Sequence, residues 1–257
     1  MNRARVIPVL LLQNSGLYKT VKYKDPKYVG DPINAVRIFN EKQCDELILL
    51  DILASKKKQN INYSLIQEIA TECFMPLAYG GGISNLTEIE NVLKLGVEKV
   101  VINSAFFNNI EFLKDAVKEF ASSTIVASVD IKKNIWGKQC VFSHSDKKSS
   151  ITDPVAYLKF LEDAGVGEIM VNDVDRDGTM IGYDLDSINK LSNSVNVPVI
   201  AAGGCKDFDD IKKVLQLTHA SAAAAGSFFI FQGKHRAVLI SYSSPEEINL
   251  IKNNERK

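Results

Sequence analysis

The chain has 257 residues, of which 46% are hydrophobic and 24% are charged, and its formal net charge is +0. This composition is ordinary for a globular protein, and the balanced charge argues against nucleic acid or an anionic membrane surface as a partner. The apolar run Val6–Leu12 is too short to span a membrane and the cysteines are scattered without a CxxC pair, so we expect a cytoplasmic protein with free thiols.

Short apolar segments alternate with amphipathic helical segments along the whole chain, which predicts repeated strand–helix units. The predicted strands are Arg5–Leu12, Glu46–Asp51, Pro76–Tyr79, Lys99–Asn103, Thr124–Asp130, Gly167–Asn172, Val197–Ala201 and Ser221–Ala225. The predicted helices are Asp31–Lys42, Tyr63–Cys73, Leu86–Leu95, Ile110–Ala121, Asp153–Ala164, Asp184–Leu191, Asp207–Leu217 and Pro245–Lys252. Such a series in about 250 residues predicts an α/β protein that folds as one (β/α)₈ TIM barrel domain over residues 1–257.

Two long connections interrupt this rhythm. The segment Lys132–Ser150 contains Trp136–Gly137–Lys138 between strand-like flanks and predicts a hairpin. The segment Gln13–Gly30 carries several lysines, including Lys19, with tyrosines between them. It is compatible both with a mobile lid over a phosphorylated ligand and with a solvated basic loop.

The same pattern of strand-ending residues occurs twice in the chain, which indicates a duplicated half-barrel. Pro76–Gly82 recurs as Pro198–Gly204, and Asp51 after one apolar strand recurs as Asp173 after another. Glycine after a strand allows backbone N–H groups to approach an anion closely. The pattern therefore predicts two sites for a bisphosphate ligand, although single glycine pairs usually only form tight turns. The candidate binding residues are Lys19, Asp51, Gly81, Gly82, Asn103, Ser104, Asp177, Gly178, Gly203, Gly204, Gly226 and Ser227.

Asp130 is the candidate catalytic residue. It ends the predicted strand Thr124–Asp130, and chemistry in such barrels takes place at the carboxyl ends of the strands. A carboxylate there suits a general acid or base. The alternative is a carboxylate that caps a loop or pairs with Lys132 or Lys133.

Four residues of alternating sign stand near the starts of four predicted strands: Arg5, Glu46, Lys99 and Glu168. If they face inward they form a charged ring at the opposite end of the barrel, where spacing alone favours a structural role. The three histidines show no ligand spacing, so we expect no metal, and no motif indicates another cofactor.

Several motifs together resemble the cyclase subunit of imidazole glycerol phosphate synthase, HisF. They are Leu50–Ser55, Tyr79–Ile83, Lys99–Ser104 and Asp175–Thr179, and the resemblance extends from Arg5 to about Phe231. It implies a (β/α)₈ barrel that docks a glutaminase subunit, HisH, on its bottom face. It also implies that ammonia passes through the barrel to the bisphosphate PRFAR, which is split into imidazole glycerol phosphate and AICAR. The charged ring would then be the ammonia gate.

The chain departs from this family at the end of the first strand. There the family carries the second aspartate of its acid/base pair, and this chain has Leu11, which cannot transfer a proton. The stretch Phe229–Tyr242 resembles HisF paralogues from surface-sugar and flagellin glycosylation loci, which are thought to pass ammonia to a separate amidotransferase that makes acetamidino sugars. A lyase/cyclase and an ammonia-conducting subunit both remain open, and Leu11 favours the second. The related sugar isomerase barrel of histidine synthesis fits less well, because its opening aspartate is also missing.

Overall fold

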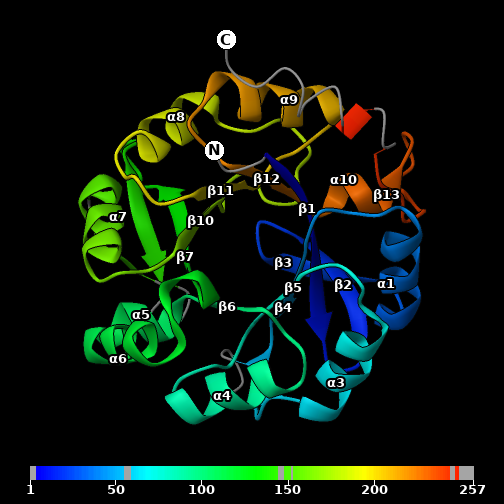
Figure 1. Cartoon of the computed structure of the whole chain (residues 1–257). Coiled ribbons are helices and arrows are strands. Elements are labelled where there is room, and N and C mark those ends of the chain that lie inside the picture. The colour runs from blue at the N-terminus through cyan, green and yellow to red at the C-terminus, as the bar shows by residue number, and fades with distance from the viewer. Residues whose placement is uncertain (1–3, 55–58, 144–147, 152, 244–246, 249–257) are drawn as a thin grey trace.

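The computed structural model describes residues 4–54, 59–143, 148–151, 153–243 and 247–248. Within these ranges, eight parallel strands close into a barrel surrounded by helices (Figure 1). Pairing of the first barrel strand with the last, and of the fifth with the sixth, leaves the barrel without a free edge. The barrel strands are β1 (Arg5–Gln13), β4 (Leu47–Asp51), β5 (Leu77–Gly80), β6 (Lys99–Ile102), β7 (Ile125–Lys133), β10 (Glu168–Asp173), β11 (Val199–Ala202) and β12 (Ala222–Ala225).

The barrel and its strands confirm the fold predicted from the sequence, with shifts of one to three residues at the strand ends. The surrounding helices are α1 (Pro32–Glu41), α3 (Tyr63–Glu72), α4 (Leu86–Lys94), α6 (Ile110–Phe120), α7 (Pro154–Asp163), α8 (Leu185–Ser192) and α9 (Phe208–Leu217). Each begins after an Asp or Asn whose side chain accepts a hydrogen bond from the first turn, as at Asp31 and Asn62. The predicted helix Pro245–Lys252 lies outside the described residues except for positions 247 and 248. No described helix is both long enough and apolar enough to cross a bilayer.

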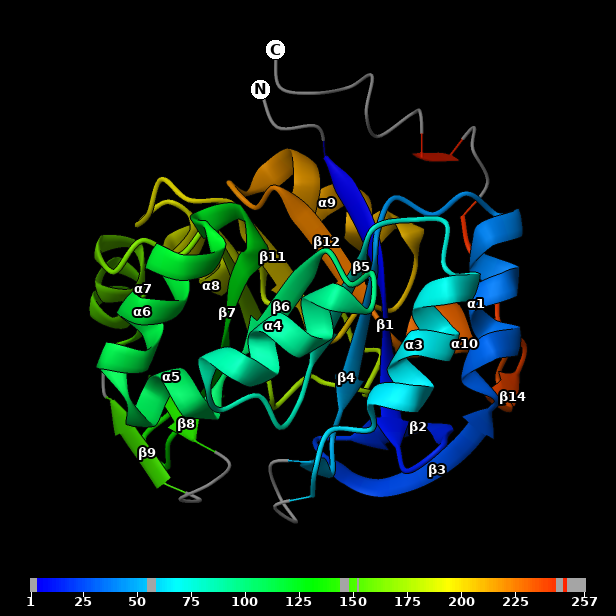
Figure 2. The ribbon, with the colours of Figure 1, turned by 60° about the horizontal axis from the view of Figure 1, so that its bottom comes forward.

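Two hairpins extend the barrel at the carboxyl ends of its strands, here called the top face. The connection after β1 was predicted as an irregular loop, but it forms the hairpin β2 (Gly16–Val21) and β3 (Lys24–Gly30). The predicted second hairpin is confirmed, since β7 pairs with β8 (Gln139–Ser143), which is followed by β9 (Lys148–Ile151). Figure 2 shows both hairpins at the end of the barrel opposite to the start of β1.

Short elements complete the described fold. The helices α5 (Ser104–Asn108) and α10 (Ser227–Ile230) begin at two of the candidate binding residues, Ser104 and Ser227. A 3₁₀ turn, η1 (Ser122–Thr124), precedes β7, and the small hairpin β13 (Phe231–Gln232) and β14 (Ala237–Val238) follows α10.

The hydrophobic core has two parts. The larger part fills the space between strands and helices, as expected for this architecture. The smaller part fills the barrel itself with Ile7, Val9, Leu11, Ile48, Ala78, Val101, Val126, Met170, Ile200, Ala202, Ala222 and Ala224. The interior is therefore apolar between the two ends, and the charged residues at the barrel ends are separated from each other.

Candidate functional site

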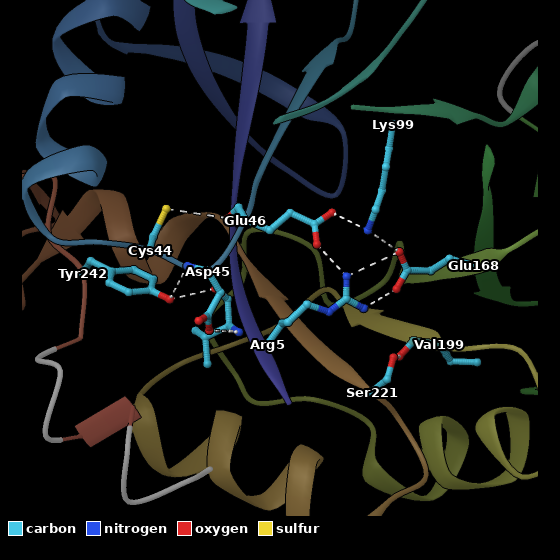
Figure 3. A network of polar contacts seen from close by, with 10 residues as sticks. Arg5, Cys44, Asp45, Glu46, Lys99, Glu168, Val199, Ser221 and Tyr242 are labelled. Carbon is cyan, nitrogen blue, oxygen red and sulfur yellow. Dashed lines mark hydrogen bonds and ion pairs between the residues drawn. The ribbon is translucent and has the colours of Figure 1, made fainter. Parts of the chain in front are cut away.

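At the bottom face, where the barrel strands begin, four charged side chains form a closed ring (Figure 3). The Arg5 guanidinium donates to Glu46 Oε2 at 2.5 Å and to the Glu168 carboxylate. Lys99 Nζ lies 3.0 Å from a carboxylate oxygen of Glu46 and 3.0 Å from one of Glu168. Each carboxylate thus bonds both cations, and the sequence-predicted residues are brought together as a ring.

The ring is buried on its acidic side and partly open on its basic side. The side chains of Glu46 and Glu168 are 3% and 6% exposed, whereas those of Arg5 and Lys99 are 21% and 20% exposed. Burial acts to lower the pKa of Arg5, but its hydrogen bonds and the charges of both carboxylates raise it overall. The two cations therefore keep contact with solvent, whereas the two carboxylates do not.

At the top face, Asp130 is buried within a network of hydrogen-bond donors. The Tyr23 hydroxyl donates to Asp130 Oδ1 at 2.7 Å, and Asn103 Nδ2 donates to Oδ2 at 2.8 Å. Asn172 Nδ2 donates to Oδ1 at 3.2 Å and also to the Tyr23 oxygen. Asp130 is therefore paired with neither Lys132 nor Lys133 in these bonds. Asn103, predicted as a phosphate ligand, donates its amide to the carboxylate.

The strand register identifies the counterpart of Asp130 in the first half of the barrel. Leu11 of β1 pairs with Leu50 of β4, one step before Asp51. Asp130 of β7 pairs with Asn172 of β10, one step before Asp173. Leu11 thus occupies in the first half the position that Asp130 occupies in the second, and it packs inside the apolar barrel core.

The two aspartates that follow these pairs hold their own loops. Asp51 Oδ1 accepts from the backbone N–H groups of Leu53 and Ala54 at 2.9 and 3.0 Å. Asp173 Oδ1 accepts from Asp175 and Arg176 at 3.0 and 3.2 Å. Burial raises the pKa of Asp173, and the nearby Arg176 opposes this rise. Both carboxylates therefore have a turn-forming role in addition to any contact with a ligand.

The repeated glycines pack on these same loops. Gly81 has φ +119° and Gly203 has φ +94°, and a Cβ atom at either would collide with the main chain of Asp51 or Asp173. Gly82 lies against Ala54, and a Cβ there would approach the Ala54 methyl to 2.9 Å. The glycines thus bring backbone N–H groups close to the barrel mouth, which is compatible with an anion at each loop.

A small pocket opens beside the second pair of loops. Residues lining it are Asp177, Gly178, Met180, Gly203, Gly204, Cys205, Ala224, Ala225, Gly226 and Ser227. Two buried polar atoms there, Asp177 Oδ2 and Ser227 Oγ, have no hydrogen-bond partner among the described residues. Buried polar atoms usually find a partner, so this pocket has unused capacity for a polar ligand or water.

The hairpin β2–β3 delivers a lysine to this pocket. Lys19 is buried, and its Nζ lies directly against Gly226, where any side chain would displace it. Burial lowers the pKa of Lys19, Asp177 opposes this and Arg236 adds to it. Burial raises the pKa of Asp177, Lys19 opposes this and Asp130 adds to it. The predicted residues Asp177, Gly178, Gly203, Gly204, Gly226 and Ser227 therefore line one pocket, and Lys19 lies against its Gly226.

Gly178 also accommodates the hairpin. Its φ is +71°, and a Cβ atom there would collide with the Thr20 carbonyl oxygen. The Lys22 N–H donates to the Asp177 carbonyl oxygen at 2.9 Å, so the hairpin is fixed to this loop by its backbone. Among the described residues, no group of three or more His, Cys, Asp or Glu side chains is placed to hold a metal ion. The four cysteines are free.

Comparison with known proteins gives a consistent result. The model of a family described as "Histidine biosynthesis protein" matches residues 5–236. The chain belongs to the HisF family. It is 50% identical, over 97% of its length and 100% of the relative, to the "Putative imidazole glycerol phosphate synthase subunit hisF2" of Pseudomonas aeruginosa. It is 37% identical, over 88% of its length and 87% of the relative, to the "Imidazole glycerol phosphate synthase subunit HisF" of Lactococcus lactis subsp. cremoris.

A further HisF-family relative is the "Putative imidazole glycerol phosphate synthase subunit hisF3" of Vibrio vulnificus, at 48% identity over 96% of the chain and 95% of the relative. The resemblance stated from the sequence motifs is thereby confirmed. Two residues of the top-face network were not predicted from the sequence. Asn172 directly precedes the repeated Asp173, which was a usable signal, whereas nothing in the sequence indicates that Tyr23 reaches Asp130.

Proposed function

We propose that this chain is the barrel subunit of a two-subunit glutamine amidotransferase. It receives ammonia from a HisH-like glutaminase at its bottom face and conducts it to a top-face site for a bisphosphorylated ligand. It has little or no cyclase activity of its own, and a separate sugar amidotransferase uses the ammonia to make an acetamidino sugar. The observation that carries this proposal is the difference between the two ends of the barrel. The charged ring at the bottom face is intact, whereas at the top face Leu11 stands in the position of a proton-transferring aspartate.

The bottom face supports the ammonia-handling part. A ring with buried carboxylates and partly exposed cations suits a gate that opens when a partner protein rearranges the ion pairs. Above it the barrel interior is apolar and contains four alanines, Ala78, Ala202, Ala222 and Ala224. An apolar passage admits a small neutral molecule such as ammonia more readily than it admits ammonium or another ion.

The top face supports an anionic ligand. Ser227 lines the pocket with Gly203 and Gly204, and Lys19 Nζ lies against Gly226 of the same pocket. In the first half Gly81 and Gly82 recur at the repeat of these glycines, and Ser104 begins α5 as Ser227 begins α10. Two such loops on one barrel mouth suit the two phosphate groups of a bisphosphate.

Leu11 supports the reduced chemistry. Losing one member of an acid/base pair typically removes on the order of 10²–10⁴ in rate. Leu11 pairs with Leu50 of β4 and with Tyr18 of β2, and its side chain packs in the apolar barrel core, so no carboxylate stands beside it in the register.

The second candidate is a true imidazole glycerol phosphate synthase cyclase, which converts PRFAR and ammonia into imidazole glycerol phosphate and AICAR in histidine biosynthesis. Asp130 and the two glycine loops favour it, since both would serve that reaction. The deciding experiment is PRFAR consumption by the unmodified chain with its cognate glutaminase or with ammonium salt. We expect turnover to be very slow or undetectable, and a rate near the usual enzyme range of about 1 s⁻¹ or faster would establish the cyclase.

The partner is tested by titrating the chain into a HisH-type glutaminase. We expect a complex by sizing and a rise in glutamine hydrolysis. Trp136→Ala, on the exposed tip of the β7–β8 hairpin, serves as the control. It should leave complex formation and the rise in glutamine hydrolysis unchanged. Absence of any complex would rule out ammonia transfer.

Sulfate soaks test the ligand site. The variants Ser104→Ala and Ser227→Ala separate its two halves. Failure of both sites to bind anion would rule out a bisphosphate.

A further inference from the structure

Tyr23 stands at the turn of the β2–β3 hairpin in a backbone conformation that its residue type disfavours. Val21 pairs with Lys24, so Lys22 and Tyr23 form a two-residue turn, with φ of +51° and +61°. Such turns strongly favour Asn-Gly, because both positions need positive φ. A non-glycine residue keeps this conformation when its surroundings impose it, and such positions gather at functional sites. The hairpin is therefore held in place by contacts beyond its own turn.

Those contacts centre on the Tyr23 hydroxyl. It donates to Asp130 Oδ1 at 2.7 Å and accepts a hydrogen bond from Asn172 Nδ2. Burial and the charge of Asp130 both raise the pKa of Tyr23 well above its usual value, so the phenol keeps its proton at physiological pH. With Asn103 on Oδ2 at 2.8 Å, both carboxylate oxygens accept bonds from the protein.

A general base must lie within hydrogen-bond reach of the proton that it removes from the substrate. In this chain the approach to Asp130 from the hairpin side is occupied by the Tyr23 phenol. The same hairpin is fixed to the second-half loops by the Lys22 N–H bond to Asp177 and by close packing of Thr20 on Gly178. It also carries Lys19 into the pocket.

We propose that Tyr23 is a positioning residue which, together with Leu11, withdraws Asp130 from proton transfer and holds the hairpin that carries Lys19 against the second-half loops. The proposal rests on the proposed function, because it concerns the same top-face site and explains why cyclase chemistry is weak there. It has a consequence that Leu11 alone does not have: restoring an aspartate at position 11 leaves Asp130 engaged with Tyr23.

The first test compares Leu11→Asp, Tyr23→Phe and the double variant in PRFAR turnover, with ammonium salt as the ammonia source so that no glutaminase is needed. We expect the PRFAR turnover rate of Leu11→Asp to stay near background. We expect the double variant to exceed that rate by at least about tenfold, because general acid–base effects typically begin at about 10². Tyr28→Phe combined with Leu11→Asp is the matched control, since it removes a hydroxyl from the exposed side of the same hairpin. Equal rates for Leu11→Asp and the double variant, including no activity in both, overturn the proposal.

The second test avoids Leu11→Asp, which places a charge in the apolar core. Hydrogen–deuterium exchange over residues 16–30 is compared in the unmodified chain, Tyr23→Phe and Tyr28→Phe. We expect at least about tenfold faster exchange in Tyr23→Phe only, because the hydroxyl holds the hairpin closed. Unchanged exchange in Tyr23→Phe overturns the positioning role. Ordinary PRFAR turnover by the unmodified chain would instead refute the weak-cyclase function, and the exchange result would still decide whether Tyr23 holds the hairpin.

Discussion

The two halves of the barrel share their turn geometry but differ in the side chains at the mouth. Gly81 packs on Asp51 as Gly203 packs on Asp173, and each aspartate holds its loop by the same two backbone bonds. At the strand ends the first half has Leu11 beside Leu50, whereas the second has Asp130 beside Asn172. Backbone packing constrains the glycines in both halves equally, whereas the register positions of Leu11 and Asp130 carry side chains of different chemistry.

At the bottom face the two halves also contribute differently, here to the charged ring. Glu46 directly precedes β4 and Glu168 begins β10, the second strands of the two halves, and both make matching bonds to the same two cations. Both cations come from the first half, and the register places Ala222 in the second half where Lys99 stands in the first. The ring therefore depends on closure of the whole barrel, since neither half contains a balanced set of charges.

The largest expected effect comes from making the second half resemble the first. Asp130→Leu removes the acceptor for the Tyr23, Asn103 and Asn172 donors, and each buried donor without a partner costs about 1–3 kcal/mol. We expect a loss of about 3–5 kcal/mol in the free energy of unfolding, measured by urea denaturation. Asp130→Asn keeps one acceptor oxygen and should lose about 1–2 kcal/mol. Equal losses in the two variants would show that the network does not stabilise the fold.

The shared turns should respond alike in both halves. Gly81→Ala and Gly203→Ala each combine positive φ with a collision against the main chain, so we expect about 2–4 kcal/mol of destabilisation. Gly96→Ala is the control, because Gly96 also has positive φ (+98°) but the nearest atom to its Cβ would be 3.8 Å away. It should lose only about 1–2 kcal/mol. A similar loss in all three, measured by thermal or urea unfolding, would contradict the packing argument.

At the ring, Glu46→Gln and Glu168→Gln should be equivalent. Each change removes the charge from a carboxylate that bonds Arg5 and Lys99, whose side chains are partly screened by solvent. We expect about 1–2 kcal/mol of destabilisation in either variant, less than for a fully buried ion pair. Urea midpoints that differ strongly between the two would show that the two halves contribute unequally to the ring.

The smallest effect concerns Asp177, whose pKa is raised above the usual 3.8 mainly by burial. A raised pKa means that folding favours the protonated form. The stabilising contribution is therefore complete below pH 3.8 and is lost as the pH rises through the folded-state pKa. Asp177→Asn should gain on the order of 1 kcal/mol at pH 7. Urea unfolding between pH 3 and 8 should show this gain shrinking as the pH falls, and a gain independent of pH would contradict the assignment.

Much of the frame was predictable from the sequence because its signals are local. The apolar segments of the strands and the Asp or Asn before each helix define the strand–helix units. The number of these units predicts that the barrel closes. The hairpin β2–β3 was missed because Lys24–Gly30 is charged, contains a proline and is mostly exposed, so it lacks the alternation of a half-buried strand. Its turn also lacks the glycine that would mark it.

The site was predictable where the sequence repeats itself and not where distant segments meet. The glycines were predicted from the repeated pattern, and the ring residues were predicted from their positions near strand starts. Tyr23 was missed because its role arises from contact with Asp130, which lies far away in the chain, and no residue type or spacing encodes that contact. Asn103 was predicted as a binding residue from its place at a strand end, but its amide bond to Asp130 was not predicted.

The seam between β1 and β12 bears on how the molecule folds. It joins Arg5 to Ala222, from nearly opposite ends of the barrel sequence, and contacts so distant in sequence form late because the chain between them must first be ordered. The strand β12 is four alanines, which bury little apolar surface to drive this closure. A barrel arrested before this step exposes the edges of β1 and β12, and unpaired edges recruit strands from other chains. Aggregation during refolding should therefore start at this seam, and a glutaminase that binds the completed ring would capture only barrels that have already closed.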